Sequence, residues 1–264
     1  MRKLKETERS HLLKYLSAEP DINMFFIGVV ENHSLDSDEI AVYAEDHPLH
    51  HFCIVILKYF ENYILYSDTD SYQVESVVNF LKNDIVDLVN GKANIIRRIA
   101  PFFPHMKEEG RSLYRLENLN ESMLENSKVK VRILTPEDAG SIVELYAQNI
   151  EYGSDFLINK EKYIEERRKN LENDGIAVGL MYKNKLVSVA ELSACHDMAG
   201  LVAGLATHPK YYGRGFATHA LTALCEEALR RGKKDICVLH DNPKIMNILK
   251  NVGFDEKNQY ALLH

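Results

Sequence analysis

The chain has 264 residues, of which 45% are apolar and 27% charged, a composition typical of a globular protein with a sizeable core. This length suits one large domain or two ordinary ones. The net charge of −7 is uneven: up to Asn126 there are 13 Lys and Arg against 21 Asp and Glu, and beyond it 19 against 18. The acidic first half is a poor host for phosphates, and no basic stripe with interleaved aromatic residues occurs, so nucleic acid is excluded as a partner.

No apolar run reaches the length of a membrane span, so we expect no membrane association. The first nine residues lack the apolar core of a signal peptide, which favours a cytoplasmic location. The four cysteines lie far apart without a C-x-x-C pair and are interpreted as reduced, buried small hydrophobes. The sequence leaves the oligomeric state open.

Residues 1–120 are predicted to form an N-terminal α/β domain. Two apolar-faced helices, near residues 12–16 and 22–30, precede three strand-like runs at residues 40–45, 52–57 and 63–66. The short spacing of these runs favours an antiparallel meander. A helix over residues 72–82 follows, and residues 85–103 are expected to be helical in part, ending at two prolines.

A histidine-rich stretch in this half raises the question of a metal. His47, His50, His51 and Cys53 lie within seven residues. In a strand, His50 would share a face with Phe52 while His51 and Cys53 would lie on the other, so the set is split between two faces. No second pair of ligands is evident elsewhere, and we therefore predict a hairpin rim rich in imidazole, with no metal.

A polar, unpatterned linker at residues 119–127 leads to a second domain, residues 128–264. We expect a strand at 129–134, a helix that begins at Thr135-Pro136, a charged helix at 160–171, and strands at 175–182, 186–194 and 198–207. A long helix then ends at Arg230-Arg231-Gly232. A strand at 235–239, a helix from Asn242 to Gly253 and a last strand at 254–263 complete the domain.

The segment between the third strand and the long helix carries two glycines, Gly213 and Gly215, on either side of Arg214. Backbone N–H groups at a helix start have no intrahelical partners, and the helix dipole adds positive charge there, so the turn favours an anion. Glycine lets a bulky phosphate approach the main chain. The order Gly215-Phe216-Ala217 excludes a Walker loop, and the third glycine of a dinucleotide fingerprint is missing. A pyrophosphate is the expected ligand.

This segment, Tyr212-Gly-Arg-Gly-Phe-Ala217 after Thr207-His208-Pro209, resembles the acyl-CoA loop of the GNAT superfamily of N-acyltransferases, whose pattern is Gln/Arg-x-x-Gly-x-Gly/Ala. Tyr212 replaces the first residue of that pattern. A second block, from Asn242-Pro243 to Gly253-Phe254, is similar to the family's Asn-Pro…Tyr…Gly-Phe segment, with Leu249 where the tyrosine usually lies. The resemblance covers about residues 128–264.

The resemblance implies an α/β fold with a mixed, mostly antiparallel central sheet flanked by helices. The two halves share the order of two helices, three strands and a helix. This predicts two tandem GNAT-like halves, the first a degenerate copy without its glycine loop, a layout similar to glycine N-acyltransferase-like proteins. The co-substrate would be acetyl-CoA, held by backbone and side-chain groups of the loop strand, the loop and the next helix: Leu205, Ala206, Thr207, Tyr212, Gly213, Arg214, Gly215, Phe216, Ala217, Thr218, Asn242 and Met246.

The implied reaction is transfer of an acetyl group to a primary amine of a small molecule or peptide by direct attack. The amine must lose a proton, and Glu191 and His208 are the candidate bases; the alternatives are a structurally paired carboxylate and a residue that shapes a turn. Tyr146, Tyr152 and Phe156 either line the acceptor pocket or are ordinary aromatic residues. Because Leu249 cannot protonate the leaving thiolate, we expect slow turnover, which a tyrosine at this position would raise if the pocket admits the ring. The alternative is a catalytically weak acyl-CoA-binding regulator, or an interaction protein whose acidic first half docks a partner.

Overall fold

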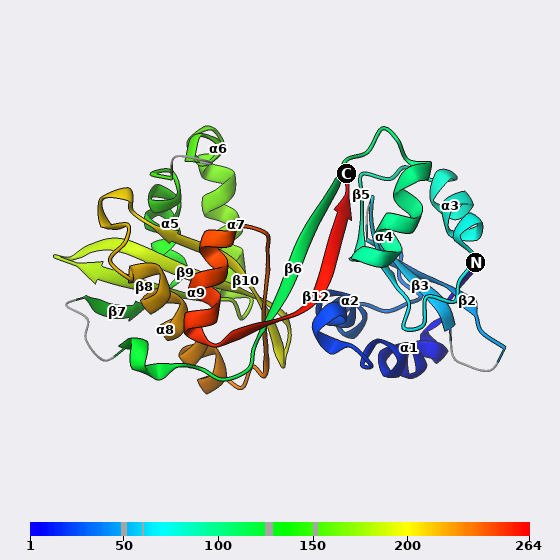
Figure 1. Ribbon diagram of the computed structural model, residues 1–264, viewed down its shortest axis with the longest axis horizontal. Helices are drawn as coiled ribbons and strands as arrows, with labels where there is room; N and C mark the ends of the chain where they lie inside the picture. Colours follow the sequence, from blue (N-terminus) through cyan, green and yellow to red (C-terminus); the bar gives the residue numbers. More distant parts are fainter. Residues whose placement is uncertain (49–51, 60, 125–128, 150–152) are drawn as a thin grey trace. The chain divides into compact units, whose positions relative to one another are not determined.

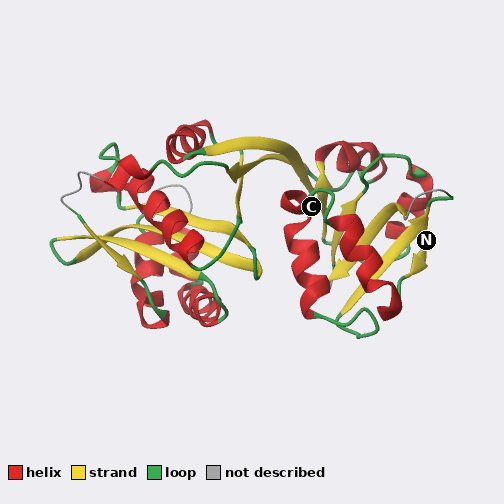
Figure 2. Cartoon of the chain, turned by 90° about the horizontal axis from the view of Figure 1, so that it is seen from below, coloured by secondary structure: helices red, strands yellow, loops and turns green. Residues whose placement is uncertain are grey.

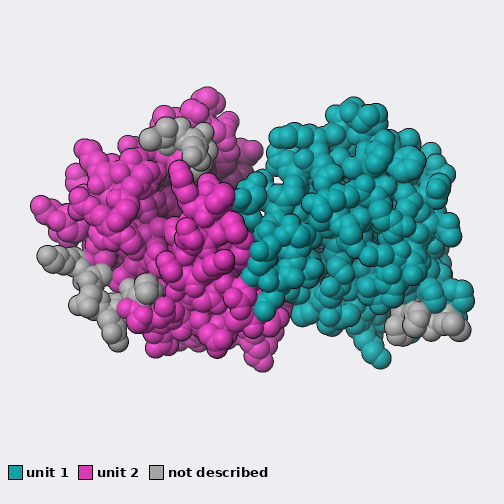
Figure 3. Space-filling view, in the orientation of Figure 1, with its two compact units in different colours: residues 1–113, 239–241, 256–264 teal, residues 114–238, 242–255 magenta. Residues whose placement is uncertain are grey.

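The computed structural model describes residues 1–48, 52–59, 61–124, 129–149 and 153–264. These residues form two compact units, coloured separately in Figure 3. Unit 1 comprises Met1–Leu113, Leu239–Asp241 and Glu256–His264, and unit 2 comprises Tyr114–Val238 and Asn242–Asp255. Each unit is a mixed, mostly antiparallel sheet flanked by helices (Figures 1 and 2), which is the predicted fold class.

Unit 1 has the strand order β1-β2-β3-β4-β5-β12. Its elements from the first half of the chain are β1 (Arg2–Lys3), α1 (Arg9–Leu16), α2 (Pro20–Asn32), β2 (Ile40–Asp46), β3 (Phe52–Tyr59), β4 (Asn62–Tyr66), α3 (Val74–Lys82), β5 (Leu88–Lys92), α4 (Ala93–Ile99) and the start of β6 (Glu108–Leu116). The apolar faces of α3 and α4 pack on β3, β4 and β5 in one buried cluster. The meander β2-β3-β4 is antiparallel as expected, and β4 pairs with β5 in parallel.

Unit 2 contains the strand order β11-β10-β9-β8-β7. Its elements are β7 (Lys130–Ile133), α5 (Ala139–Tyr146), α6 (Gly153–Ile158), α7 (Lys160–Glu172), β8 (Ile176–Tyr182), β9 (Lys185–His196), β10 (Ala199–Thr207), α8 (Phe216–Arg230), β11 (Asp235–His240) and α9 (Pro243–Val252). The last strand, β12 (Phe254–Leu263), begins in unit 2 and belongs to unit 1 from Glu256 onward. The helix after Thr135-Pro136 begins with a 3₁₀ turn that is closed by a capping box between Thr135 and Asp138.

The two faces of this sheet carry different helices. On one face, Leu221, Leu224 and Cys225 of α8 and Leu249 of α9 pack against Ile176 and Val178 together with other strand residues. On the other face, Ile142 and Tyr146 of α5 pack against Ala177 and Val189. The alternation of Ala177 with Ile176 and Val178 is the period of two that a sheet covered on both faces requires.

The halves repeat the same plan, as predicted. In each, a first strand and two helices or more precede a three-stranded antiparallel meander, a helix, a parallel strand and a further helix. The final strands are exchanged. Residues Tyr260–Leu263 of β12 pair antiparallel with Val89–Lys92 of β5 in unit 1. Conversely, Tyr114–Leu116 at the end of β6 belong to unit 2, where β6 neighbours β11.

The structure contains two elements that the sequence analysis did not anticipate. Residues 85–103 are helical in part, as expected, in α4 and a 3₁₀ turn at Ala100–Phe102, but β5 at Leu88–Lys92 precedes them. The short helix α6 lies between the two helices that were expected at the start of the second half. His50 and His51 lie outside the described residues. Among the residues that are described, no three His, Cys, Asp or Glu side chains gather as a metal site would require.

The longest helix of the described residues, α8, has 15 residues, and none of these helices combines the length and hydrophobicity of a membrane span.

Candidate acyl-CoA and acceptor site

A gap opens along one edge of β10. This strand pairs in parallel with β11 over Ala199–Leu201, whereas its antiparallel pairing with β9 continues to Thr207. From residue 202 onward, the described residues of β10 therefore have no strand partner on the β11 side. Backbone N–H and C=O groups left without a partner must find one elsewhere, so this edge is suited to a ligand with amide groups.

The direction of the backbone groups decides which residues face the gap. The Ala206 carbonyl accepts a hydrogen bond of 3.0 Å from the Ser188 hydroxyl, and the His208 N–H donates to the Val187 carbonyl at 2.9 Å. Both partners lie on β9. Since backbone groups of successive strand residues point to opposite sides, those of Leu205 and Thr207 face the gap. Of the three predicted contacts on β10, Ala206 is thus turned away.

The glycine loop has the conformation that an anion site requires. Gly213 and Gly215 have φ angles of 73° and 76°, and α8 begins directly at Phe216. Within the described part of the chain, the N–H groups of residues 213–218 donate to no backbone carbonyl. A methyl group at either glycine would meet no atom within 4 Å, so the loop stands open. Exposed N–H groups at the start of a 15-residue helix, beside Arg214, form a positive site.

The side chains around this loop have structural partners as well. Phe216 stacks on Tyr211 with ring centroids 5.9 Å apart, and the Arg214 guanidinium lies 5.4 Å from the Tyr211 ring. Tyr212, at the departure from the family pattern, is half exposed. Ala217 and Thr218 form the first turn of α8.

The residues predicted on α9 have local roles. Asn242 is the N-cap of α9, and its Oδ1 accepts from the Lys244 N–H at 2.9 Å. Met246 packs against the cluster that α8 forms on the sheet. Leu249 is only 1% exposed in the same cluster. An aromatic ring inserted here would overpack the core, so this packing does not meet the condition that the pocket admit a tyrosine at 249.

Glu191 is a buried carboxylate at the centre of the unit 2 sheet. It lies on β9 directly opposite Gly204 of β10, and the residue is 3% exposed. Burial raises the pKa of the Glu191 carboxyl, while the charge of Arg167 and a hydrogen bond from Tyr146 act in the opposite direction. The Arg167 Nε lies 3.6 Å from Oε2. A carboxyl of raised pKa beside a ligand gap has the chemistry of a general base.

Gly204 explains how Glu191 reaches this position. A methyl group built on Gly204 would lie 1.9 Å from the Tyr146 hydroxyl oxygen and 2.9 Å from the Glu191 Oε2. The carboxylate thus occupies the space that a side chain of the loop strand would fill. β10 itself has no acidic residue, and the side chain of Glu191 from the neighbouring strand takes that place. Because Gly204 has no Cβ, the Tyr146 hydroxyl also fits there.

The contacts of His208 favour the alternative to a catalytic base, a residue that shapes a turn. It is the N-cap of the 3₁₀ turn Pro209–Tyr211, and its Nδ1 accepts from the Lys210 N–H at 3.2 Å. The imidazole also meets the Tyr211 ring edge-on at 5.7 Å. These contacts are those of a residue that shapes the turn after β10.

Sequence reasoning missed two residues of the acceptor side, Tyr163 and Arg167 on α7. The Tyr146 and Phe156 rings stack at 4.9 Å, and the Phe156 and Tyr163 rings at 4.3 Å. The spacing of Tyr163 and Arg167, four residues apart on a predicted helix, places them on one face and was an available signal. Tyr152 lies outside the described residues.

Unit 1 lacks the corresponding features. Its β4 pairs with β5 from Asn62 to Leu65, which leaves a single residue of β4 beyond the pairing. The loop to α3 carries Asp68 and Asp70 in place of glycines, and α3 has Glu75 in its first turn. Negative charge at this helix start disfavours a phosphate.

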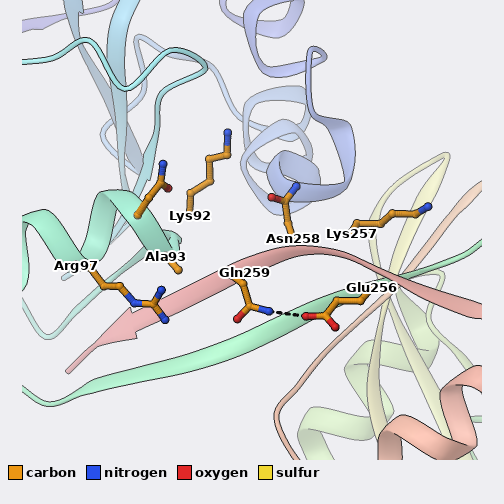
Figure 4. A pocket seen from close by; sticks show the side chains of 8 residues that line it. Lys92, Ala93, Arg97, Glu256, Lys257, Asn258 and Gln259 are labelled. Atoms are coloured by element: carbon orange, nitrogen blue, oxygen red, sulfur yellow. Dashed lines mark hydrogen bonds between the residues drawn. The ribbon is translucent and has the colours of Figure 1, made fainter.

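A polar pocket of about 600 Å³ does occur in unit 1 (Figure 4). Two of its cations are already paired, Lys92 with Glu19 at 2.5 Å and Arg97 with Glu108 at 3.1 Å. Gln259 donates to Glu256 across its floor, at the dashed line in Figure 4. Paired charges and amides of this kind do not form an anion site.

Comparison with known proteins agrees with this geometry. Residues 143–254 match the model of the acetyltransferase (GNAT) family. A solved structure of a Drosophila protein shares the fold with a TM-score of 0.65 and 14% identity, over 100% of this chain and 98% of that one. A GCN5-related N-acetyltransferase-like protein from Streptococcus suis gives 0.60 and 11%, over 98% and 99%. A tandem GNAT protein from the clavulanic acid biosynthesis pathway gives 0.60 and 9%, over 99% and 96%. No curated protein matches the sequence.

The family match therefore covers residues 143–254, and the fold of the whole chain is that of the solved GNAT structures, in agreement with the resemblance.

Proposed function

We propose that unit 2, with its GNAT domain, transfers an acetyl group from acetyl-CoA to a primary amine of a small molecule or peptide. The observation that carries the proposal is the gap beside β10, which ends at the open glycine loop. The pantetheine amides of CoA would bind the backbone of Leu205 and Thr207. The pyrophosphate would bind the N–H groups of residues 213–218, with Arg214 adding charge.

The chemical step needs a neutral amine. An alkylammonium has a pKa of about 10, so at neutral pH a base must take its proton. Glu191 would accept that proton and pass it to solvent. The nitrogen lone pair then forms the N–C bond, the C–S bond breaks with its electron pair going to sulfur, and the second nitrogen proton is lost as the amide forms.

A thiol has a pKa of about 8.5, so its thiolate can leave without a protein side chain to protonate it. The buried Leu249 supplies none, which favours slow transfer and keeps the catalytically weak acyl-CoA-binding regulator as the second candidate. Release of free thiol from acetyl-CoA with a panel of primary amines tests the proposal. Binding of acetyl-CoA without thiol release for any amine would favour the regulator.

We expect one acetyl-CoA to bind per chain. Unit 1 has a paired β4 and an acidic loop where unit 2 has the gap and the glycines. Titration calorimetry of the full chain measures the stoichiometry. The full chain is required because β12 pairs with β5 of unit 1. In a fragment that contains only the second half, β12 would have lost β5 as its partner. Two equivalent sites would refute the distinction between the units.

Gly215→Ala is expected to weaken acetyl-CoA binding by about 10- to 100-fold, the loss of one hydrogen bond to a charged group. The methyl group would stand between the phosphate and the loop backbone. Gly232→Ala is the matched control, since Gly232 lies at the other end of α8 with φ 89° and equally open surroundings. Both variants suffer the same left-handed strain of about 1 kcal/mol. Equal affinities in calorimetry would mean that the loop is only a turn.

A further inference from the structure

The acceptor side of unit 2 holds an arginine among aromatic rings. The Arg167 guanidinium carbon lies 5.3 Å from the ring centroid of Tyr146, 5.5 Å from that of Phe156 and 5.7 Å from that of Tyr163. We call these three rings the aromatic cluster. The three rings are stacked, with Phe156 between Tyr146 and Tyr163, and the guanidinium lies against this stack. Aromatic rings at this distance attract a cation electrostatically, and groups of rings bind quaternary ammonium ligands in other proteins.

The arginine is held loosely by its charged partners. Its Nε lies 3.6 Å from Glu191 and a terminal nitrogen 3.7 Å from Glu166, both longer than the 2.7–2.9 Å of a charge-assisted hydrogen bond. Arg167 Nε and Glu191 Oε2 are both buried, and at these two atoms the contacts of the carboxyl group with Arg167 and Tyr146 fall short of ordinary hydrogen-bond geometry. A polar ligand that forms good hydrogen bonds with this buried carboxylate oxygen and this buried N–H group would therefore gain binding free energy.

The helix that carries Arg167 is itself weakly anchored. None of the 13 residues of α7 is fully buried, and the Arg167 side chain, 18% exposed, is among its deepest. Withdrawal of this side chain gives up its contacts with the three rings but uncovers no fully buried residue of α7. The site differs in this from a core arginine, whose loss would leave a cavity.

The charges around the aromatic cluster select the ligand. Three carboxylates face it: Glu191, Glu166, and Asp155, which accepts from the Tyr163 hydroxyl. Lys162, 70% exposed, lies 6.0 Å from the Tyr163 ring. Once the Arg167 side chain has left, three carboxylates and only one cation, the solvated Lys162, remain around the aromatic cluster. The cluster then favours a positively charged ligand and repels a carboxylate.

We propose that the acceptor enters as an alkylammonium that takes the place of the Arg167 guanidinium in the aromatic cluster, beside Glu191. This rests on the proposed function and names its acceptor class: primary alkylamines without a carboxylate next to the amine, such as aliphatic diamines or lysine side chains. The ammonium gives its proton to Glu191 and becomes the neutral nucleophile. Arg167 is then a positioning residue that fills the site until the amine arrives.

The test compares matched ligands on the full chain. Pentylamine and norleucine differ only by the carboxylate beside the amine, and their binding is measured by calorimetry with and without coenzyme A. Pentylamine is expected to bind at least about tenfold more tightly, the effect of about 1.4 kcal/mol. Equal or tighter binding of norleucine would overturn the proposal, because Arg167 would then be a receptor for a carboxylate. This comparison uses the unmodified protein, so it does not depend on the folding of a variant.

A pair of arginine variants tests the displacement. Arg167→Gln vacates the aromatic cluster and is expected to tighten pentylamine binding by about tenfold, in the range of one partly desolvated cation–π contact. Arg168→Gln, at the neighbouring 45% exposed arginine paired with Glu165, should change nothing. Weaker binding in Arg167→Gln, with the fold intact by circular dichroism, contradicts the proposal. Binding of coenzyme A alone is measured beforehand. If coenzyme A does not bind, the proposed function is wrong, whereas the comparison of the two amines still shows whether the aromatic cluster binds an alkylammonium group.

Discussion

Glu191→Gln is expected to lower kcat by about 10²- to 10⁴-fold, the usual contribution of a general base. The amide has nearly the same shape and keeps the contact with Tyr146, but it cannot accept the ammonium proton. Steady-state thiol release at pH 7 measures the effect. Because the proposed co-substrate site lies on β10 and α8, acetyl-CoA affinity should stay within about twofold, less than the weakest hydrogen bond would contribute.

The pH profile separates a base from a structural carboxylate. Burial raises the pKa of Glu191, and only the ionised form accepts a proton, so the wild-type rate falls as the pH drops through that raised pKa. In Glu191→Gln this limb disappears, and the rate instead rises about tenfold per pH unit with the fraction of free amine. Glu227→Gln is the control, a buried glutamate of α8 that is paired with Arg230 and Arg231. An unchanged profile in Glu191→Gln would rule out the base.

Much of unit 2 could be predicted from its sequence because the signals there are local. The Pro136 start, the alternation in β8 and β9, and the glycines before Phe216 each depend on a few adjacent residues. The boundaries of α8 followed from Gly215 at one end and the basic turn before Gly232 at the other. The position of Glu191 opposite Gly204 follows from strand register, which a sequence fixes only once the β-bulge in β10 is known.

The parts that escaped prediction depend on partners far away in the chain. Asn90-Gly91 in β5 is typical of a turn, yet this segment is a strand because β4 and β12 pair with it on both sides. The exchange of β6 and β12 leaves no local trace, since a strand does not specify which sheet it joins. The aromatic cluster brings together residues of three helices. Arg167 was not predicted to belong to it, because the many charges of α7 indicated only a solvent-exposed helix.

The glycine at 204 connects both sides of the proposed chemistry. On β10 it continues the strand whose edge would hold the pantetheine, and its missing side chain makes room for Tyr146 and Glu191. A carboxylate that is fixed in this way needs no freedom of its own, because the tyrosine and the strand register determine where it lies. The position therefore tests whether the placement of Glu191, rather than its presence alone, matters.

Gly204→Ala is accordingly expected to lower kcat by about 10²-fold, as displacements of about 1 Å do when a catalytic group loses its geometry. The new methyl group cannot coexist with a hydroxyl oxygen 1.9 Å away, and the Tyr146 ring cannot yield easily because it is stacked on Phe156. Overpacking should also lower the free energy of unfolding by about 1–3 kcal/mol. Gly200→Ala on the same strand is the matched control: its methyl group would lie 2.3 Å from a terminal carbon of Leu192, so it strains the core without touching Glu191. Thermal unfolding and thiol release are measured on both. If the two variants lose stability alike but only Gly204→Ala loses turnover, the carboxylate acts through its position; if both keep wild-type kcat, Glu191 is not the base.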